Sequence, residues 1–195
     1  MAEPPHRILG IDPGTRLCGW GIVDRHGAQI THVDNGVIVL DSRTALDQRL
    51  GCLMQRLKEI IDSHRPNSVA VEGVFQHRNA RSALILGHAR GVALAVAASY
   101  NLNVFEYAAR QVKKAVTGSG TAQKAQIQQM VALRANLDDV PQEDAADAIA
   151  IALCHAQANP DIPHEIRAKP GRRRGKKASR AALAALAEQQ QRQRR

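Results

Sequence analysis

One short segment near the start of the chain, residues 7–16 (RILGIDPGTR), constrains the fold most. Its apolar run predicts a buried β-strand that ends at Asp12. Pro13-Gly14 follows at once and predicts a turn, after which residues 17–23 (LCGWGIV) resume an apolar strand. An Asp before Pro-Gly also commonly starts a turn by bonding to the backbone. Asp12 therefore indicates a functional site only if other carboxylates converge on the same edge of the sheet.

The remaining pattern predicts an α/β fold. We expect a third strand at 27–40, a helix at 45–61, a strand at 68–72, a helix at 80–99, a strand at 102–105, and helices at 108–116, 122–135 and 142–158. Ser42 and Asn79 are the expected N-caps of the first two helices. Three consecutive strands with short connections indicate an antiparallel meander, so the sequence predicts a mixed five-stranded sheet flanked by helices.

The composition suits one globular domain with an appended tail. Of the 195 residues 44% are hydrophobic but only 3% are aromatic, so Ala, Val, Leu and Ile must build the core. The three cysteines are far apart and form no metal-binding or redox motif. The first residues do not resemble a signal peptide, and no apolar run approaches the ~18 residues of a membrane span. We therefore expect a cytoplasmic protein that does not enter a membrane.

Charge is distributed unevenly along the chain. Residues 167–195 hold eleven Lys and Arg against one acid, and we expect them to form a disordered basic tail after a domain of residues 1–166. Residues 73–134 hold eight basic side chains and one acid, whereas residues 135–166 hold seven acids and no Lys or Arg. Basic runs are often only solvated surface. Two such blocks beside an acidic one favour a nucleic acid as the partner.

Four carboxylates are candidates for one site: Asp12, Glu72, Asp144 and Asp147. Glu72 ends a short apolar strand as Asp12 does, so both lie at one edge if the two strands are neighbours. Asp144 and Asp147 are three residues apart on a predicted helix and share a face, with Glu143 as an alternative. Acids in a first helical turn often only complement the helix dipole. That explanation suits Glu143 and Asp144 better than Asp147, which lies in the second turn.

Converging carboxylates of this kind require a cation, because like charges at short range raise one another's pKa. Hard oxygen ligands without a Cys or His cluster favour Mg²⁺, with Mn²⁺ as a substitute, over Zn²⁺. A carboxylate site beside a basic surface suits two-metal phosphodiester hydrolysis, in which one ion activates water and the other stabilises the leaving oxygen.

Four segments resemble, in order and spacing, the RuvC family of bacterial Holliday-junction resolvases: GIDPGTRLCGWGIV, VEGVFQHRNARSALILGHARGVAL, FEYAARQVKKAVTGSGTAQKAQI and EDAADAIAIALCHA. The resemblance covers about residues 7–158 and implies an RNase H-like fold. It also implies a homodimeric crossover junction endodeoxyribonuclease that nicks four-way DNA junctions in pairs with Mg²⁺, in partnership with the RuvA–RuvB branch-migration complex. The matching catalytic and metal-binding acids are Asp12, Glu72, Asp144 and Asp147. The tail has no counterpart in the pattern.

Five further residues have expected roles at the DNA. Lys113 and Lys124 match basic positions near the family's active site, where they would hold the scissile phosphate; ordinary solvated lysines are the alternative. Phe75, in a predicted loop with Arg78 and Arg81 nearby, could anchor the loop in the core or stack on an unpaired base at the crossover. The family match favours stacking.

Three other functions compete with junction resolution. The first is a nuclease of the same fold that cuts another structured nucleic acid. The second is an actin-like nucleotide-binding protein with residues 12–15 as a phosphate loop, although that fold needs a second such loop and none is present. The third is a junction-binding protein whose acids only maintain structure. Mg²⁺-dependent cleavage of four-way junctions, compared with flaps and RNA–DNA hybrids, separates these functions.

Overall fold

The computed structural model describes residues 4–73 and 80–158, without the side chains of residues 80–82. Its strands are β1 (His6–Asp12), β2 (Leu17–His26), β3 (Gln29–Val39), β4 (Ser68–Glu72) and β5 (Asn103–Tyr107). Its helices are α1 (Leu46–His64), α2 (Ala80–Ser99), α3 (Ala109–Thr117), α4 (Lys124–Ala135) and α5 (Glu143–Gln157). Within the described ranges, no helix is long and apolar enough to cross a bilayer.

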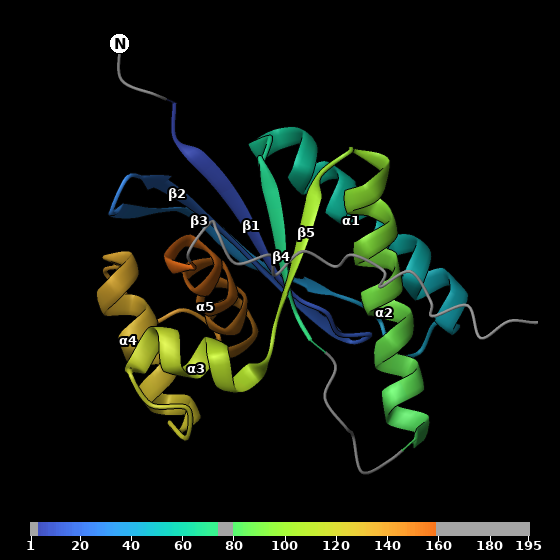
Figure 1. Ribbon diagram of the computed structural model, residues 1–195. Helices are drawn as coiled ribbons and strands as arrows, with labels where there is room; N and C mark the ends of the chain where they lie inside the picture. The colour runs from blue at the N-terminus through green and yellow to red at the C-terminus, as the bar shows by residue number, and fades with distance from the viewer. Residues whose placement is uncertain (1–3, 74–79, 159–195) are drawn as a thin grey trace, which may run out of the picture.

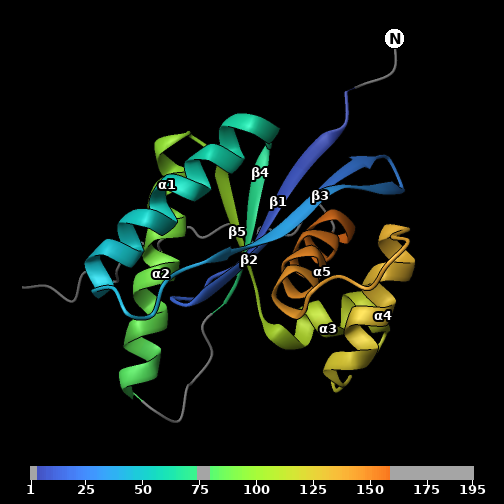
Figure 2. The same ribbon diagram turned by 180° about the vertical axis from the view of Figure 1, so that it is seen from behind.

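The five strands form one sheet in the order β3-β2-β1-β4-β5. β1, β2 and β3 pair antiparallel, and β4 and β5 join them in parallel. The predicted meander and the mixed five-stranded sheet are therefore confirmed. Helices α1 and α2 cover one face, and α3, α4 and α5 cover the other (Figures 1 and 2).

The core is divided between the two faces of the sheet because side chains alternate along each strand. On β1, Leu9 and Ile11 belong to the apolar cluster that faces α1 and α2. Ile8 belongs to the cluster that includes much of α5. Ala and the branched aliphatic residues fill most of both clusters, as the low aromatic content requires.

The backbone of helix α5 lies directly against the backbone of strands β1 and β2 at three glycines. Gly10 and Gly21 are cross-strand partners, and Gly19 is the partner of Asp12. A Cβ at Gly10 would be 2.1 Å from the Ala148 carbonyl oxygen, and one at Gly21 would be 2.7 Å from a side-chain carbon of Ile149. Only glycine permits such an approach of helix backbone to strand backbone. These three glycines, called here the glycine seam, determine where the first turns of α5 lie on the sheet.

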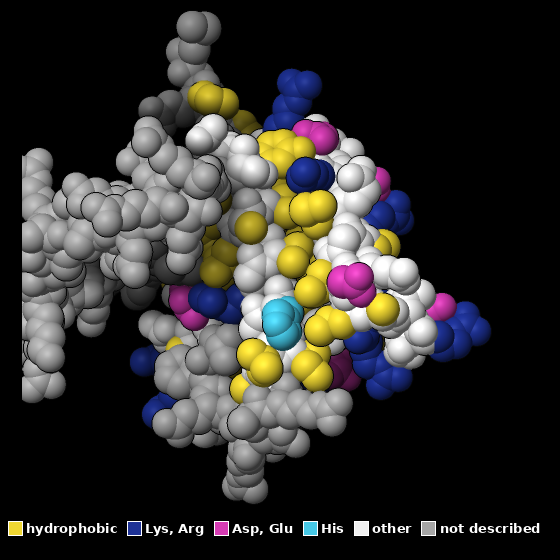
Figure 3. Space-filling model, turned by 90° about the vertical axis from the view of Figure 1, so that its right-hand side faces the viewer, with side chains coloured by type: hydrophobic (Ala, Val, Ile, Leu, Met, Phe, Trp, Pro, Cys, Tyr) yellow, Lys and Arg dark blue, Asp and Glu magenta, His cyan; other side chains and the backbone are white. Residues whose placement is uncertain are grey.

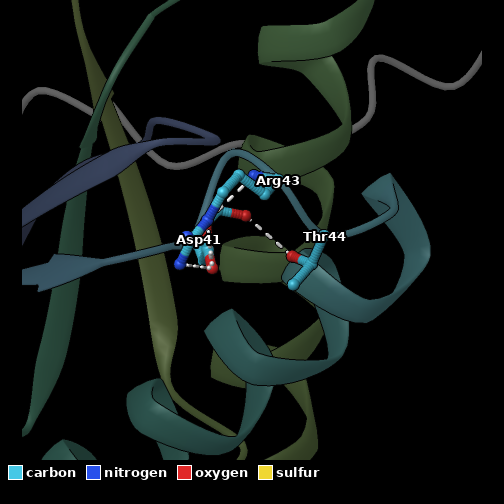
Figure 4. A network of polar contacts seen from close by, with 3 residues as sticks. All are labelled: Asp41, Arg43 and Thr44. Carbon is cyan, nitrogen blue, oxygen red and sulfur yellow. Dashed lines mark hydrogen bonds and ion pairs between the residues drawn. The ribbon is translucent and has the colours of Figure 1, made fainter.

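The turn between β3 and α1 differs from the prediction. The N-cap of α1 is Ala45, without a side-chain hydrogen bond, so the assignment of Ser42 as the cap was wrong. Asp41 organises the turn instead: its carboxylate accepts from the Arg43 backbone N–H at 2.9 Å, and its carbonyl accepts from the Thr44 hydroxyl at 2.7 Å (Figure 4). An Asp that bonds two residues ahead is an Asx-type turn, which competes with a Ser cap. The other predicted cap, Asn79, lies outside the described residues.

Candidate active site

Asp12 and Glu72 lie at one edge of the sheet. β1 and β4 run parallel with Ile11 opposite Val71, so Asp12 and Glu72 are the next residues on two neighbouring strands. Alternation from Ile11 and Val71, which face α1 and α2, places both acids on the α5 side. The expectation that these strands are neighbours is confirmed.

The first two turns of α5 lie over the same edge because of the glycine seam. A Cβ at Gly19 would be 1.9 Å from the carbonyl oxygen of Asp144, so this turn of the helix rests on the strand residue that pairs with Asp12. Asp147, one turn further on, lines the cavity that this arrangement leaves. The sequence pattern did not identify Gly10, Gly19 and Gly21 as site-forming residues, although Gly19 and Gly21 are two residues apart, the period that puts both on one face of a strand.

A cavity of about 300 Å³ joins three of the four predicted acids to the two predicted lysines. Asp12, Glu72 and Asp147 line it together with Lys113 and Lys124. Asp144 is half-buried in the preceding turn and is not among the lining residues. Among the described residues, no three Asp, Glu, His or Cys side chains are already gathered closely enough to ligate one ion.

The cavity carries an excess of negative charge. Burial raises the pKa of the Asp12 carboxyl to about 7, and the carboxylates of Glu72 and Asp147 add to the shift. Burial also raises the pKa of Asp147, and Lys124 opposes that rise. Carboxylates that are both desolvated and crowded hold their protons until a cation compensates them. The set of oxygen donors therefore fits a hard divalent cation.

Lys113 lies on α3, and Lys124 is the first residue of α4. The Lys113 ammonium donates to the Ala122 carbonyl at 3.3 Å, which keeps its stem beside the cavity. Lys124 forms an ion pair with Glu143, and this hydrogen bond raises the pKa of Lys124. Glu143, the alternative candidate ligand, is thus an exposed residue at the rim rather than part of the cavity lining.

The remaining predicted DNA contacts cannot be placed. Phe75 and Arg78 lie outside the described residues, and Arg81 lies in the first turn of α2, where side chains are not described. Their roles stay predictions.

Residues 8–155 match the family described as crossover junction endodeoxyribonuclease RuvC. The chain belongs to this family. The curated RuvC of Citrifermentans bemidjiense is 52% identical over 151 residues, which are 77% of this chain and 92% of that protein. The RuvC of Nitrosomonas eutropha is 46% identical over 150 residues, which are 77% of this chain and 84% of that protein.

Solved structures agree with the RuvC assignment. The chain is similar to T. thermophilus RuvC in complex with a Holliday junction substrate, with a TM-score of 0.73 and 34% identity over 77% of this chain and 93% of that one. The yeast mitochondrial Holliday junction resolvase, at 12% identity and a TM-score of 0.54 over 80% of this chain and 81% of that one, shares the fold alone. The resemblance to RuvC and the RNase H-like fold are confirmed. Because the family match ends at residue 155, the boundary between a domain of residues 1–166 and a tail of residues 167–195 stays a prediction.

Replacing Asp12 by Asn is expected to stabilise the chain in a metal-chelating buffer at about pH 8. The folded-state pKa is about 7 against an ordinary 3.8, so between these values the folded protein binds a proton that the unfolded chain releases. Folding stability therefore falls as pH rises through this window. Asn keeps the shape without the charge, which we expect to be worth on the order of 2 kcal/mol at that pH.

Thermal melts followed by circular dichroism measure this effect. At about pH 8 the Asp12→Asn protein should melt roughly 4–8 °C above the parent. The difference should disappear near pH 3, below both pKa values, where the parent carboxyl is protonated in the folded state and largely so in the unfolded chain. A variant that melts below the parent at the higher pH would contradict the charge crowding described above.

Proposed function

We propose that this chain resolves Holliday junctions by symmetric paired nicks, as an endodeoxyribonuclease of homologous recombination and DNA repair. The observation that carries the proposal is the cavity in which Asp12, Glu72 and Asp147 meet Lys113 and Lys124 in a RuvC-family chain. A carboxylate-lined cavity with cationic side chains at its wall has the donors that both a metal ion and a phosphodiester require.

Mg²⁺ is the proposed cofactor, and Mn²⁺ is expected to substitute for it. Asp12, Glu72 and Asp147 would hold the ions, with Asp144 contributing from the preceding turn. When bound, two such ions supply an activated water and stabilise the leaving oxygen. The chain's own contribution is to keep the carboxylates desolvated and to place the Lys113 and Lys124 ammonium groups where the scissile phosphate gains charge.

A homodimer follows from the symmetry of the substrate, since two nicks at symmetric positions need two active sites. The exposed side of α2 supports such a contact. Leu84 is 64% exposed, and a Cβ at Gly87 or Gly91 would have no atom of the described residues within 4 Å. Figure 3, which views this side, shows apolar side chains gathered between the charged ones. Light scattering of the purified chain, alone and on a junction, tests the proposal, and a monomer in both states would defeat it.

Three further parts of the proposal rest on family membership and the sequence. Phe75, Arg78 and Arg81 are proposed to contact DNA at the crossover. The RuvA–RuvB branch-migration complex is the proposed functional partner, and a cytoplasmic location is proposed because the substrate is chromosomal DNA. The tail of residues 167–195 is proposed to add sequence-independent phosphate contacts.

The decisive experiment is cleavage of an immobile four-way junction by the purified chain with Mg²⁺. Flaps, linear duplex and RNA–DNA hybrids of matched length serve as competing substrates. We expect paired nicks on two strands of like polarity in the junction, and little cutting of the others. Equal cutting of hybrids or flaps would indicate a different structured nucleic acid as the substrate, and tight binding without nicking would indicate a non-catalytic junction binder.

A further inference from the structure

A second cavity lies at the opposite end of the sheet from the acids. It has a volume of about 420 Å³ and is bordered by the first residues of β1, β4 and β5, the turn between β2 and β3, and the last turn of α5. This volume is within the range of small-molecule sites. Among the described residues that line it there is no Asp or Glu, in contrast to the acid cavity.

One buried polar group in its lining is the Ser68 hydroxyl, in a residue that is 2% exposed. Two imidazoles converge on this oxygen: the Nε2 atom of His6 at 3.0 Å and the Nε2 atom of His155 at 3.2 Å. The Tyr107 hydroxyl lies 2.7 Å from Nδ1 of the same His155. With Tyr107 donating to His155, a continuous chain of donors leads through Ser68 to His6. The imidazoles and the hydroxyl are thus held in place before any ligand arrives.

The Arg25 guanidinium gives the cavity a positive charge that no carboxylate among the described lining residues neutralises. Arg25 is the cross-strand partner of His6, so their side chains share one face of the sheet. The Nε–H of Arg25 donates to the Gly27 carbonyl at 3.0 Å, which steadies the guanidinium at the mouth. Arg7, on the other face, is by contrast paired with Asp24 at 2.7 Å.

One wall of the cavity is aromatic. The rings of Phe105 and His155 are 4.3 Å apart between centroids and inclined by 31°. An aromatic wall beside one guanidinium and an imidazole donor is complementary to a phosphorylated ligand with a planar or apolar body. Burial, followed by the charge of Arg25, lowers the pKa of His6, so this imidazole serves as a neutral hydrogen-bonding group and Arg25 supplies the positive charge.

We propose that this cavity binds a small phosphorylated molecule of nucleotide size. Its phosphate lies between His6 and Arg25, with Ser68 holding the His6 ring from beneath, and its body lies against Phe105. The site is separate from the acid cavity and does not depend on the nuclease function. Phosphate groups of the DNA backbone share this chemistry, and the experiment below separates the two sources.

Calorimetric titration of the full chain with 5′-AMP tests the proposal. A chelator in the buffer prevents nucleotide from binding through metal ions at the acid cavity, and adenosine serves as the ligand without phosphate. We expect AMP to bind and adenosine to bind at least tenfold more weakly. Arg25→Gln should weaken AMP binding by roughly tenfold or more, in line with the loss of a hydrogen bond to a charged group.

Two further variants sharpen the result. Arg43→Gln removes the same charge from an exposed arginine outside the cavity and should leave AMP affinity unchanged. His6→Gln, which retains a hydrogen-bonding side chain toward Ser68, should weaken AMP binding if Arg25→Gln fails to fold. No AMP binding at millimolar concentration, or equal affinity in the parent and both cavity variants, would overturn the proposal. So would a loss of duplex DNA affinity in Arg25→Gln without AMP binding to the parent.

Discussion

The Asp147→Asn protein is expected to bind four-way junctions at least as tightly as the parent and to lose cleavage by a factor of at least roughly 10². Asp147 lines the cavity with Asp12 and Glu72, and burial raises its pKa. Asn keeps the side-chain volume but removes a charged ligand oxygen. Less negative charge beside a polyanion also removes repulsion, so the affinity for DNA should not fall.

Glu143→Gln is the matched control for this experiment. It makes the same change of charge on the same helix, four residues earlier and outside the cavity lining. The substitution removes the exposed ion pair between Glu143 and Lys124. Such pairs contribute at most about 1 kcal/mol to the free energy of unfolding. We expect cleavage close to that of the parent. Gel assays of cleavage and binding on one junction measure both variants; loss of cutting in Glu143→Gln with normal cutting in Asp147→Asn would reassign the ligand.

The Gly19→Ala protein is expected to be destabilised and to lose cleavage even at temperatures where it is folded. The added methyl group would lie 1.9 Å from the Asp144 carbonyl oxygen, so α5 must move away from the sheet. Overpacking of this kind costs roughly 1–3 kcal/mol. The displacement also carries Asp147 away from Asp12, and a misplacement of about 1 Å can cost roughly 10²-fold in rate.

Gly51→Ala provides the comparison. Gly51 is an exposed residue of α1, and within the described part of the chain a Cβ there would meet no atom within 4 Å. This substitution should stabilise the helix by roughly 0.5–1 kcal/mol and leave cleavage unchanged. Thermal melts and junction cleavage below the melting range measure both proteins. Unchanged stability and full cleavage in Gly19→Ala would show that the close approach of α5 does not position the acids.

The ends of β1 and β4 could be predicted well because each apolar run stops at an acid followed by a turn residue. Those signals are local, so they placed Asp12 and Glu72 at the ends of their strands, whereas the parallel pairing of β1 with β4 that brings both acids to one edge is a long-range feature seen only in the structure. The position of Asp144 outside the cavity lining could not be predicted in this way. It depends on how far α5 slides along the sheet, which the glycine seam decides from another part of the chain.

Two other features also depend on contacts between distant segments, so local sequence patterns could not predict them. Lys124 and Glu143 are 19 residues apart in sequence, and only the packing of α4 against α5 brings them together. The cavity around Ser68 draws its polar groups from β1, β2, β4, β5 and α5, and no local pattern links these segments. Ser42 failed as a predicted cap for the opposite reason, because a stronger local competitor, Asp41, was one residue away.

Because α5 contacts β1 and β2 directly, the packing of the backbone sets the distance between the acids of the helix and the acids of the sheet. In most binding sites, shortening a neighbouring side chain lets a ligand group relax by a fraction of an ångström. Here the helix rests on glycine residues, so the strands have no side chain at the seam that could be shortened. The cavity should therefore resist attempts to widen it for a larger ion such as Ca²⁺ by surface redesign. A change in metal preference would require rebuilding the seam, with a different helix register or a different pair of strands beneath it.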